Sequence, residues 1–227
     1  MNLLVYLGII IIFKQITDNF FFNVQNKHSL FRSFFCFFIS TLSLCFSVCY
    51  WNHLLLTPLD STYLSTIINQ LMLSYMLVDI IYLAITTNIK EIRIELIFHH
   101  VICICLYGAF YDKSIMAFCA LGEILSAFNW IGILYPQYEW SIKLFRLYSI
   151  LFIRFFVWTF TLVFLYRYNW LFWFGFISII FFIILDCYWI WLIISNYIKY
   201  KSFIVDKISS KTKKILIHKK SNKNYTL

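Results

Sequence analysis

The chain has few of the residues that end helices or carry charge. Among its 227 residues are only 2 prolines and 5 glycines, and only 13% are Asp, Glu, Lys or Arg. A soluble domain carries about 25% charged residues, so this composition excludes an ordinary soluble globular protein. The scarcity of turn residues and the lack of a regular alternation of polar and apolar residues also exclude an outer-membrane barrel.

Long apolar stretches make up most of the chain instead. Hydrophobic residues account for 62% of the sequence, and the mean hydropathy is +0.80. A membrane-spanning helix needs about 20 apolar residues. Stretches of this kind lie at residues 31–51, 63–86, 95–111, 114–135, 144–166 and 170–198.

Residues 1–13 form a further, shorter apolar segment. It has neither the basic start nor the small-residue cleavage site of a signal peptide, so we interpret it as a short additional span. The sequence therefore predicts an all-α fold, a polytopic integral membrane helical bundle with six core spans plus a short N-terminal span. We divide it into an N-terminal segment and loop (1–30), a transmembrane core (31–198) and a C-terminal tail (199–227).

Positive charge is concentrated in this tail. Nine lysines lie between Lys199 and Lys223, opposed by Asp206 alone. After a membrane span, such a run is typical of a cytosolic segment that contacts anionic lipid headgroups, and we expect no binding to nucleic acid. The positive-inside rule then orients every loop consistently. The predicted cytosolic side holds Lys14, Lys27, Arg32, Lys90, Arg93 and Lys143, and the opposite side holds Lys113 and Arg167.

The 7 cysteines all lie in apolar stretches, and their spacing matches no zinc-binding pattern. We interpret them as small residues of the core or of the lipid-facing surface. The sequence thus predicts no metal site and no tightly bound cofactor.

The candidates for function are ionisable residues inside the apolar stretches, because such groups are costly in hydrocarbon. His99 and His100 are adjacent, and Glu95 lies one turn before His99 on the same helix face. His100 points about 100° away, so the two rings must have different surroundings. One can contact Asp79 on the preceding span while the other faces a cavity. The remaining histidines, His28, His53 and His218, are expected in loops or in the tail.

A carboxylate that holds one imidazole nitrogen suits a general base, which would take a proton from a hydroxyl or an amine. The same arrangement suits a purely structural hydrogen bond, and the residues alone leave both interpretations open. A second group consists of Glu123, Arg154 and Asp186, at similar depth near the bilayer midplane. Because unpaired charges are costly there, Arg154 is predicted to pair with Glu123, with Asp186 or with both. This group is either a helix-packing network or the polar floor of a lipid or substrate cavity.

Three short motifs in this order resemble the TLC domain family, named for TRAM, Lag and CLN homology. They are Ser74-Tyr75-Met76-Leu77-Val78-Asp79, Glu95-Leu96-Ile97-Phe98-His99-His100 and Gly122-Glu123-Ile124-Leu125-Ser126-Ala127-Phe128-Asn129-Trp130. The resemblance covers residues 31–198. In the third motif Glu123 replaces one acid of the ceramide synthases in this family, and their second acid is missing. The chain is therefore more similar to the short TLC-domain-containing proteins.

The resemblance implies a protein of lipid metabolism in the endoplasmic reticulum. As an enzyme it would be an acyltransferase of the ceramide-synthase type, with acyl-CoA as co-substrate. His99 and His100 would act as general base, with Asp79 and Glu95 orienting the rings. The candidate substrate-binding residues are Tyr75, Glu123 and Asn129 from the motifs, together with Arg154 and Asp186 from the buried charged group. The alternatives are a non-catalytic lipid-binding regulator of membrane composition and, more weakly, a seven-span receptor. The sequence does not define an oligomeric state.

Overall fold

The computed structural model describes residues 3–23, 27–58, 60–86, 94–110, 113–166 and 169–223. All regular structure in these ranges is helical, and six of the helical segments are long and apolar enough to cross a membrane. The chain is thus an all-α polytopic helical bundle, and the predicted fold class is confirmed. It divides into two compact units, residues 1–186 and 187–227, which are described separately.

The first unit contains the helices that build the core. In chain order they are α1 (Leu3–Phe20), α2 (Lys27–Cys49), α3 (Trp51–Leu56), α4 (Tyr63–Thr86), α5 (Ile94–Ala109), α6 (Ser114–Cys119), α7 (Ile124–Ala127), α8 (Asn129–Leu134), α9 (Glu139–Tyr148), α10 (Phe155–Leu165) and the first part of α11 (Asn169–Lys223). Two 3-10 turns, η2 (Ala120–Glu123) and η3 (Pro136–Tyr138), and one π-helical turn, η4 (Ser149–Arg154), join some of them without a loop. The described part of the second unit is the rest of α11.

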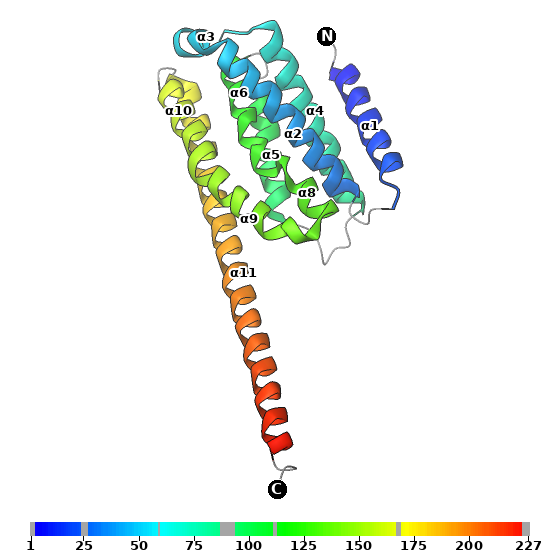
Figure 1. Ribbon diagram of the computed structural model, residues 1–227. Coiled ribbons are helices and arrows are strands. Elements are labelled where there is room, and N and C mark those ends of the chain that lie inside the picture. Colours follow the sequence, from blue (N-terminus) through cyan, green and yellow to red (C-terminus); the bar gives the residue numbers. More distant parts are fainter. Residues whose placement is uncertain are drawn as a thin grey trace. The chain divides into compact units, whose positions relative to one another are not determined.

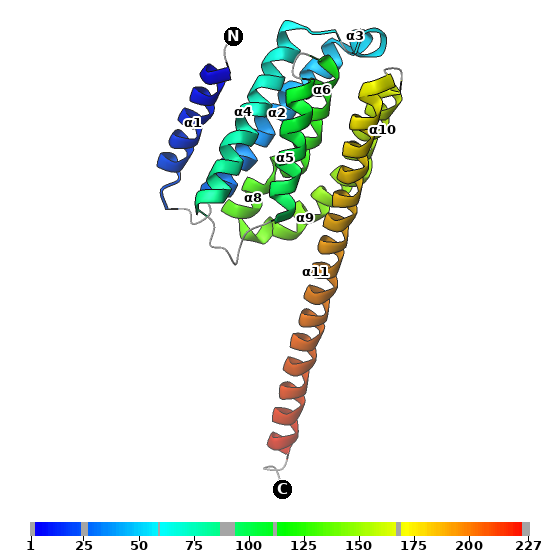
Figure 2. The ribbon, with the colours of Figure 1, turned by 180° about the vertical axis from the view of Figure 1, so that it is seen from behind.

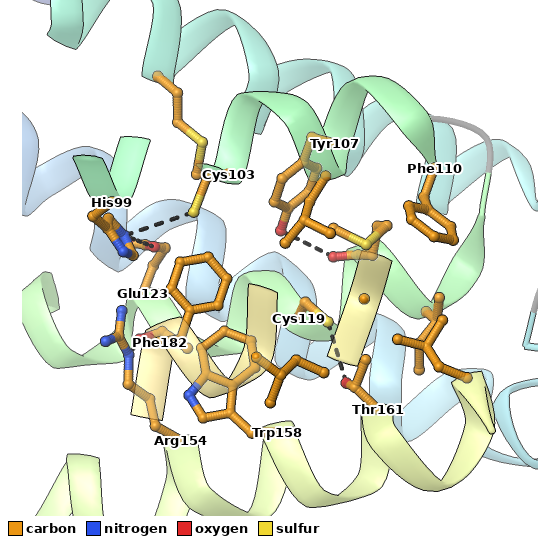
Figure 3. A pocket seen from close by; sticks show the side chains of 18 residues that line it. His99, Cys103, Tyr107, Phe110, Cys119, Glu123, Arg154, Trp158, Thr161 and Phe182 are labelled. Carbon is orange, nitrogen blue, oxygen red and sulfur yellow. Dashed lines mark hydrogen bonds and ion pairs between the residues drawn. The ribbon is translucent and has the colours of Figure 1, made fainter. Parts of the chain in front are cut away.

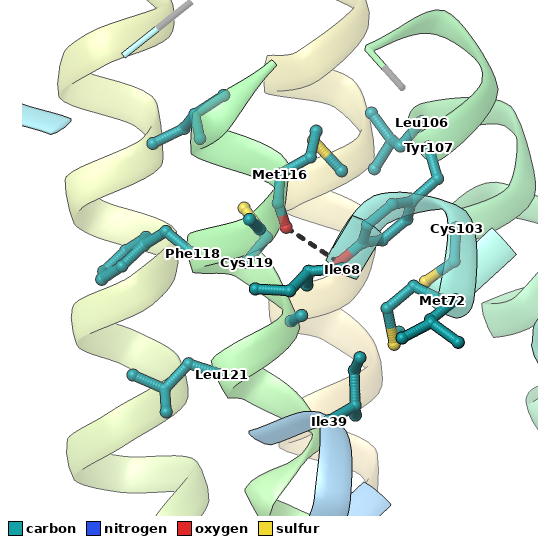
Figure 4. Packing of buried hydrophobic residues seen from close by; sticks show 14 of the residues in the cluster. Ile39, Ile68, Met72, Cys103, Leu106, Tyr107, Met116, Phe118, Cys119 and Leu121 are labelled. Atoms are coloured by element: carbon teal, nitrogen blue, oxygen red, sulfur yellow. Dashed lines mark hydrogen bonds between the residues drawn. The ribbon is translucent and has the colours of Figure 1, made fainter. Parts of the chain in front are cut away.

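Helix α2 lies at the centre of the first unit. It packs against α1 and α4 on one side and against α6, η2, α7 and α8 on another (Figure 1). Seen from behind, α4 lies between α1 and α5, and it contacts both (Figure 2). Buried apolar side chains fill the space between these helices, among them Ile39, Ile68 and Met72 (Figure 4). The contacts bring residues of α2, α4, α5 and η2 together in one interior.

Both prolines lie in connections between helices. Pro58 follows α3, and its carbonyl accepts a hydrogen bond from the backbone N–H of Ile115 at the start of α6 (2.9 Å). Pro136 begins η3, and the residue before a proline is disfavoured in α-helical conformation, which explains the break after Leu134. The rest of the chain lacks these breakers, and long helices result.

The predicted span 114–135 is interrupted rather than continuous. It consists of α6, η2, α7 and α8, with a break at Phe128. In a bilayer the backbone groups freed by such a break need partners inside the protein. Ser33 on α2 supplies them, because its Oγ donates to the carbonyl of Ser126 (2.9 Å) and accepts from the N–H of Trp130 (2.7 Å).

Other boundaries also differ from the sequence-based expectation, among them the predicted span 144–166, which begins earlier, at Pro136. Helix α1 has 18 residues and is long enough to span a bilayer, so the predicted 1–13 segment was too short. Helix α2 begins at Lys27 and includes residues that were expected in a loop. The tail is helical as well, since α11 continues to Lys223. By contrast, the predicted span 63–86 coincides with α4.

Candidate functional site

Asp79 on α4 is the centre of a cluster of basic side chains. Its carboxylate is fully buried, and Arg32 on α2 binds it in a forked arrangement, with Nη2 2.9 Å from Oδ2 and Nε 3.2 Å from Oδ1. His28 Nε2 lies 2.6 Å from Oδ1, and His100 Nδ1 lies 3.0 Å from Oδ2. One carboxylate therefore joins three helices, and the predicted meeting of Asp79 with the histidine pair is confirmed through His100.

The expectation that His28 lies in a loop is wrong. His28 is in the first turn of α2, and its ring stacks on that of Tyr82 with the centroids 3.8 Å apart. The helix begins four residues before the predicted boundary because Lys27 and His28 extend beyond the apolar stretch on which that boundary was based. His28 and Arg32 are four residues apart, so they share a face of α2. This spacing was the signal that could have revealed the cluster.

His99 has different surroundings from His100, as predicted. Its Nε2 lies 3.8 Å from Oε1 of Glu123 on η2 and 3.8 Å from the Sγ of Cys103, one turn further along α5. The carboxylate beside this ring thus comes from another segment of the chain. Glu95, which was expected to orient the ring, is half-buried in the first turn of α5, and its proposed role stays a prediction.

Arg154 holds the second predicted group together. Its Nη1 donates to Oδ1 of Asp186 at 2.5 Å, and its Nε donates to the carbonyl of Gly122 at 3.1 Å. The indole Nε1 of Trp158 donates to the other oxygen of Asp186 at 3.1 Å. The predicted pairing of Arg154 is therefore confirmed for Asp186, while Glu123 instead lies beside His99. Arg154 ends the π-helical turn η4, a distortion that often occurs at functional sites.

A small cavity, about 30 Å³ in volume, lies between His99, Glu123 and Arg154 and the surrounding apolar side chains (Figure 3). His99, Glu123 and Arg154 form its polar end. The rest of the wall is almost entirely apolar and includes Phe110 and Phe182. The cavity thus has a polar end and an apolar wall, and a ligand larger than a few water molecules requires side chains of this wall to move.

The other predicted site residues do not line this cavity. His100 and Asp79 belong to the cluster of basic side chains around Asp79. Asp186 pairs with Arg154, which does line the cavity. Tyr75 is buried beside His100, with the two ring centroids 6.0 Å apart. Asn129 begins α8 and is half-buried.

Two further wall residues were not assigned to the site from the sequence. Cys103 was interpreted as a small residue of the core or of the lipid-facing surface, and its position one turn after His99 places it on the same face of the helix. Trp158 was not singled out, although it lines the cavity and donates a hydrogen bond to Asp186. Within the part of the chain that the structure describes, no group of three or more His, Cys, Asp or Glu side chains is suited to hold a metal ion.

Comparison of the chain with protein-family models, with curated proteins and with solved structures finds no match. No relative therefore assigns a role to any residue of the cavity.

Close packing at the apolar end of the cavity gives a testable prediction. A Cβ atom added to Gly175 would clash with Cδ1 of Leu165, and both residues line the cavity. Because Leu165 is buried, Gly175→Ala is expected to push it from its place and to destabilise the fold by about 1–3 kcal/mol. Thermal unfolding in detergent measures this effect.

The matched control is Gly8→Ala on α1, where an added Cβ has no atom within 4 Å. This variant is expected to be as stable as the parent protein or slightly more stable, because alanine favours helix more than glycine does. Equal stabilities of the two variants would show that the approach of α10 and α11 at Gly175 is not tight.

Proposed function

We propose that this chain is a TLC-domain-like membrane protein of lipid metabolism that transfers an acyl group from acyl-CoA to a lipid amine or hydroxyl. The observation that carries this proposal is the cavity with a polar end of His99, Glu123 and Arg154 and an otherwise apolar wall. An acyl chain fits an apolar wall, and a reactive carbonyl belongs beside the polar groups. Two of the three TLC-like motifs contribute His99 and Glu123 to this end.

In the proposed reaction His99 acts as the general base. It takes a proton from the amine or hydroxyl of the acceptor, whose nitrogen or oxygen forms a bond to the thioester carbon. The carbon–sulfur bond to CoA then breaks, and the CoA thiolate receives the proton from His99. Glu123, 3.8 Å from Nε2, would stabilise the charged imidazolium. The reaction needs no metal and no tightly bound cofactor.

The two histidines have separate functions in this proposal. His99 lines the cavity, whereas His100 contacts Asp79, which Arg32 and His28 also contact. We assign His100 and Asp79 to holding α4 and α5 in place, so that His99 keeps its position. Glu95 remains a candidate for orienting the start of α5.

The test is an acyl-transfer assay with the purified protein in lipid nanodiscs, with long-chain acyl-CoA and lipid amines or alcohols as acceptors. Loss of a general base lowers rates by about 10²–10⁴-fold, so His99→Ala is expected to abolish detectable product. Mass spectrometry of the lipids measures it. His53→Ala is the matched control, because His53 lies on α3 outside the cavity wall and should leave the rate unchanged. A folded His99→Ala protein with unchanged transfer would refute the assignment.

A non-catalytic lipid-binding regulator is the second candidate. It is favoured by the pairing of Arg154 with Asp186 and by the presence of only one histidine of the pair in the cavity wall. In this case no product forms with any acceptor, while the lipid composition of cells still changes with the amount of protein. The same polar end would then hold a headgroup.

The membrane and the orientation are part of the proposal. We propose the endoplasmic reticulum, with the C-terminus in the cytosol and the Lys-rich tail at anionic headgroups. The exposed apolar side chains of the long helices, such as Phe152 and Ile184, support contact with membrane lipids.

A further inference from the structure

We propose that Cys103 is a covalent nucleophile of the transfer, which takes the acyl group from CoA before the acceptor receives it. This inference rests on the proposed acyl-transfer function. Cys103 and His99 are four residues apart on α5 and share a face of that helix. Both line the cavity, and the Sγ of Cys103 lies 3.8 Å from Nε2 of His99 (Figure 3).

Two groups that can activate a thiol lie beside Cys103. The thiol and the carboxylate of Glu123 both lie 3.8 Å from the same imidazole nitrogen, Nε2 of His99. A nucleophile beside a base is a signature of covalent catalysis, and a carboxylate near that nitrogen stabilises the imidazolium formed when the base takes the thiol proton. Glu123 is itself held in place, because the thiol of Cys36 donates to its other oxygen at 3.5 Å.

The neighbouring cysteines lack this combination. Cys36 contacts Glu123 and the hydroxyl of Tyr75, and it does not line the cavity. Cys119 lines the cavity, but the neighbour of its sulfur is the hydroxyl of Thr161 at 3.3 Å, which is not a base. Cys103 thus combines access to the cavity with an imidazole beside the sulfur.

The chemistry of the cavity wall matches the intermediate that the proposal requires. Beyond Cys103 the apolar wall continues through Leu106 on α5 and Phe110 directly after it, so an acyl chain attached to the sulfur would lie against apolar side chains once these move apart. An apolar wall also limits water, and a thioester is then protected from hydrolysis. The guanidinium of Arg154 at the polar end places positive charge in the same cavity, where the thioester oxygen becomes negative during attack.

The proposed reaction has two balanced steps. First, His99 takes the thiol proton, the sulfur of Cys103 forms a bond to the carbonyl carbon of acyl-CoA, the bond to CoA breaks, and the CoA thiolate takes the proton from His99. Second, His99 takes a proton from the acceptor amine or hydroxyl, which attacks the new thioester. The sulfur of Cys103 leaves and regains a proton from His99, and no oxidant or reductant is consumed.

The test uses the full-length protein in nanodiscs, incubated with long-chain acyl-CoA and no acceptor, followed by peptide mass spectrometry. We expect an acyl group on Cys103 that neutral hydroxylamine removes. The modification should be absent in Cys103→Ala and reduced about 100-fold or more in His99→Ala. Cys103→Ser, which preserves size and fold, should carry either no acyl group or an ester that resists hydroxylamine. Cys105→Ala, two residues further on and exposed, is the matched control and should leave acylation of Cys103 and product formation unchanged.

Two outcomes separate this inference from the proposed function. If Cys103→Ala forms product at the parent rate, the covalent step is refuted, and direct transfer with His99 as base stands. If the parent protein acylates Cys103 through His99 but transfers the group to no acceptor, the thioester step is supported and the proposed transfer is refuted. The inference would also be overturned if exposed cysteines were acylated to the same extent as Cys103. In that case the acylation would also be equally strong in His99→Ala.

Discussion

Asp79→Ala is expected to destabilise the protein by about 3–5 kcal/mol in the free energy of unfolding, because it removes one partner of a buried ion pair. The guanidinium of Arg32 would lose the oxygens that lie 2.9 and 3.2 Å from it, and it has little access to water. His28 and His100 would lose their shared contact as well. Thermal unfolding in detergent measures the change.

A second variant distinguishes the cost of an unpaired charge from the contribution of the pair. Asp79→Leu combined with Arg32→Met replaces the ion pair by apolar groups and should recover most of the stability. The matched control is Glu139→Gln, which breaks the more exposed pair of Glu139 with Lys143 and should cost at most about 1 kcal/mol. An Asp79→Ala protein as stable as Glu139→Gln would show that the cluster does not hold α2, α4 and α5 together.

Arg154→Ala is expected to have an effect of similar size, about 3–5 kcal/mol, because it removes the cationic partner of the buried carboxylate of Asp186, to which the indole of Trp158 still donates. The carbonyl of Gly122 would also lose the donor at 3.1 Å. Arg154→Lys should recover only part of the loss, since a single ammonium group does not reproduce the two directions of the guanidinium. The unfolding free energy in detergent is again the measurement.

The strictest test of this network is charge reversal. Arg154→Glu brings a third carboxylate close to Glu123 and Asp186, and we expect no folded protein by size-exclusion chromatography. Arg154→Met combined with Asp186→Leu is the matched variant, which removes both charges and should fold. If Arg154→Glu alone gave a normal yield of folded protein, the ion pair would not be needed for the arrangement of η4 and α11.

The parts of the fold that were predictable depend on local properties of the chain. An apolar stretch of sufficient length must form a helix in a bilayer, because only then are its backbone groups satisfied within one segment. Residues 63–86 illustrate this, since the predicted stretch and α4 coincide. Pairing of Arg154 was also predictable, because a buried charge without a partner is too costly.

Other features depend on contacts between helices and could not be predicted from local pattern. At the break at Phe128, Ser33, which is far away in the sequence, hydrogen-bonds to the backbone of Ser126 and Trp130. The π-helical turn that ends at Arg154 leaves no mark in the hydropathy. His28 was missed because its contact with Asp79 requires a helix that begins beyond the apolar stretch.

The candidate site shows the same division. The sequence by itself determined that the chain is a helical membrane bundle and that His99 and His100 face different surroundings, because hydropathy and the angle between adjacent helical residues are local properties. Only the tertiary structure decided that Asp79 contacts His100, Arg32 and His28, and that Glu123 and Cys103 lie beside His99 at the cavity. Such contacts between side chains of different helices depend on the rotation of each helix about its own axis. That rotation follows from the packing of all the helices together.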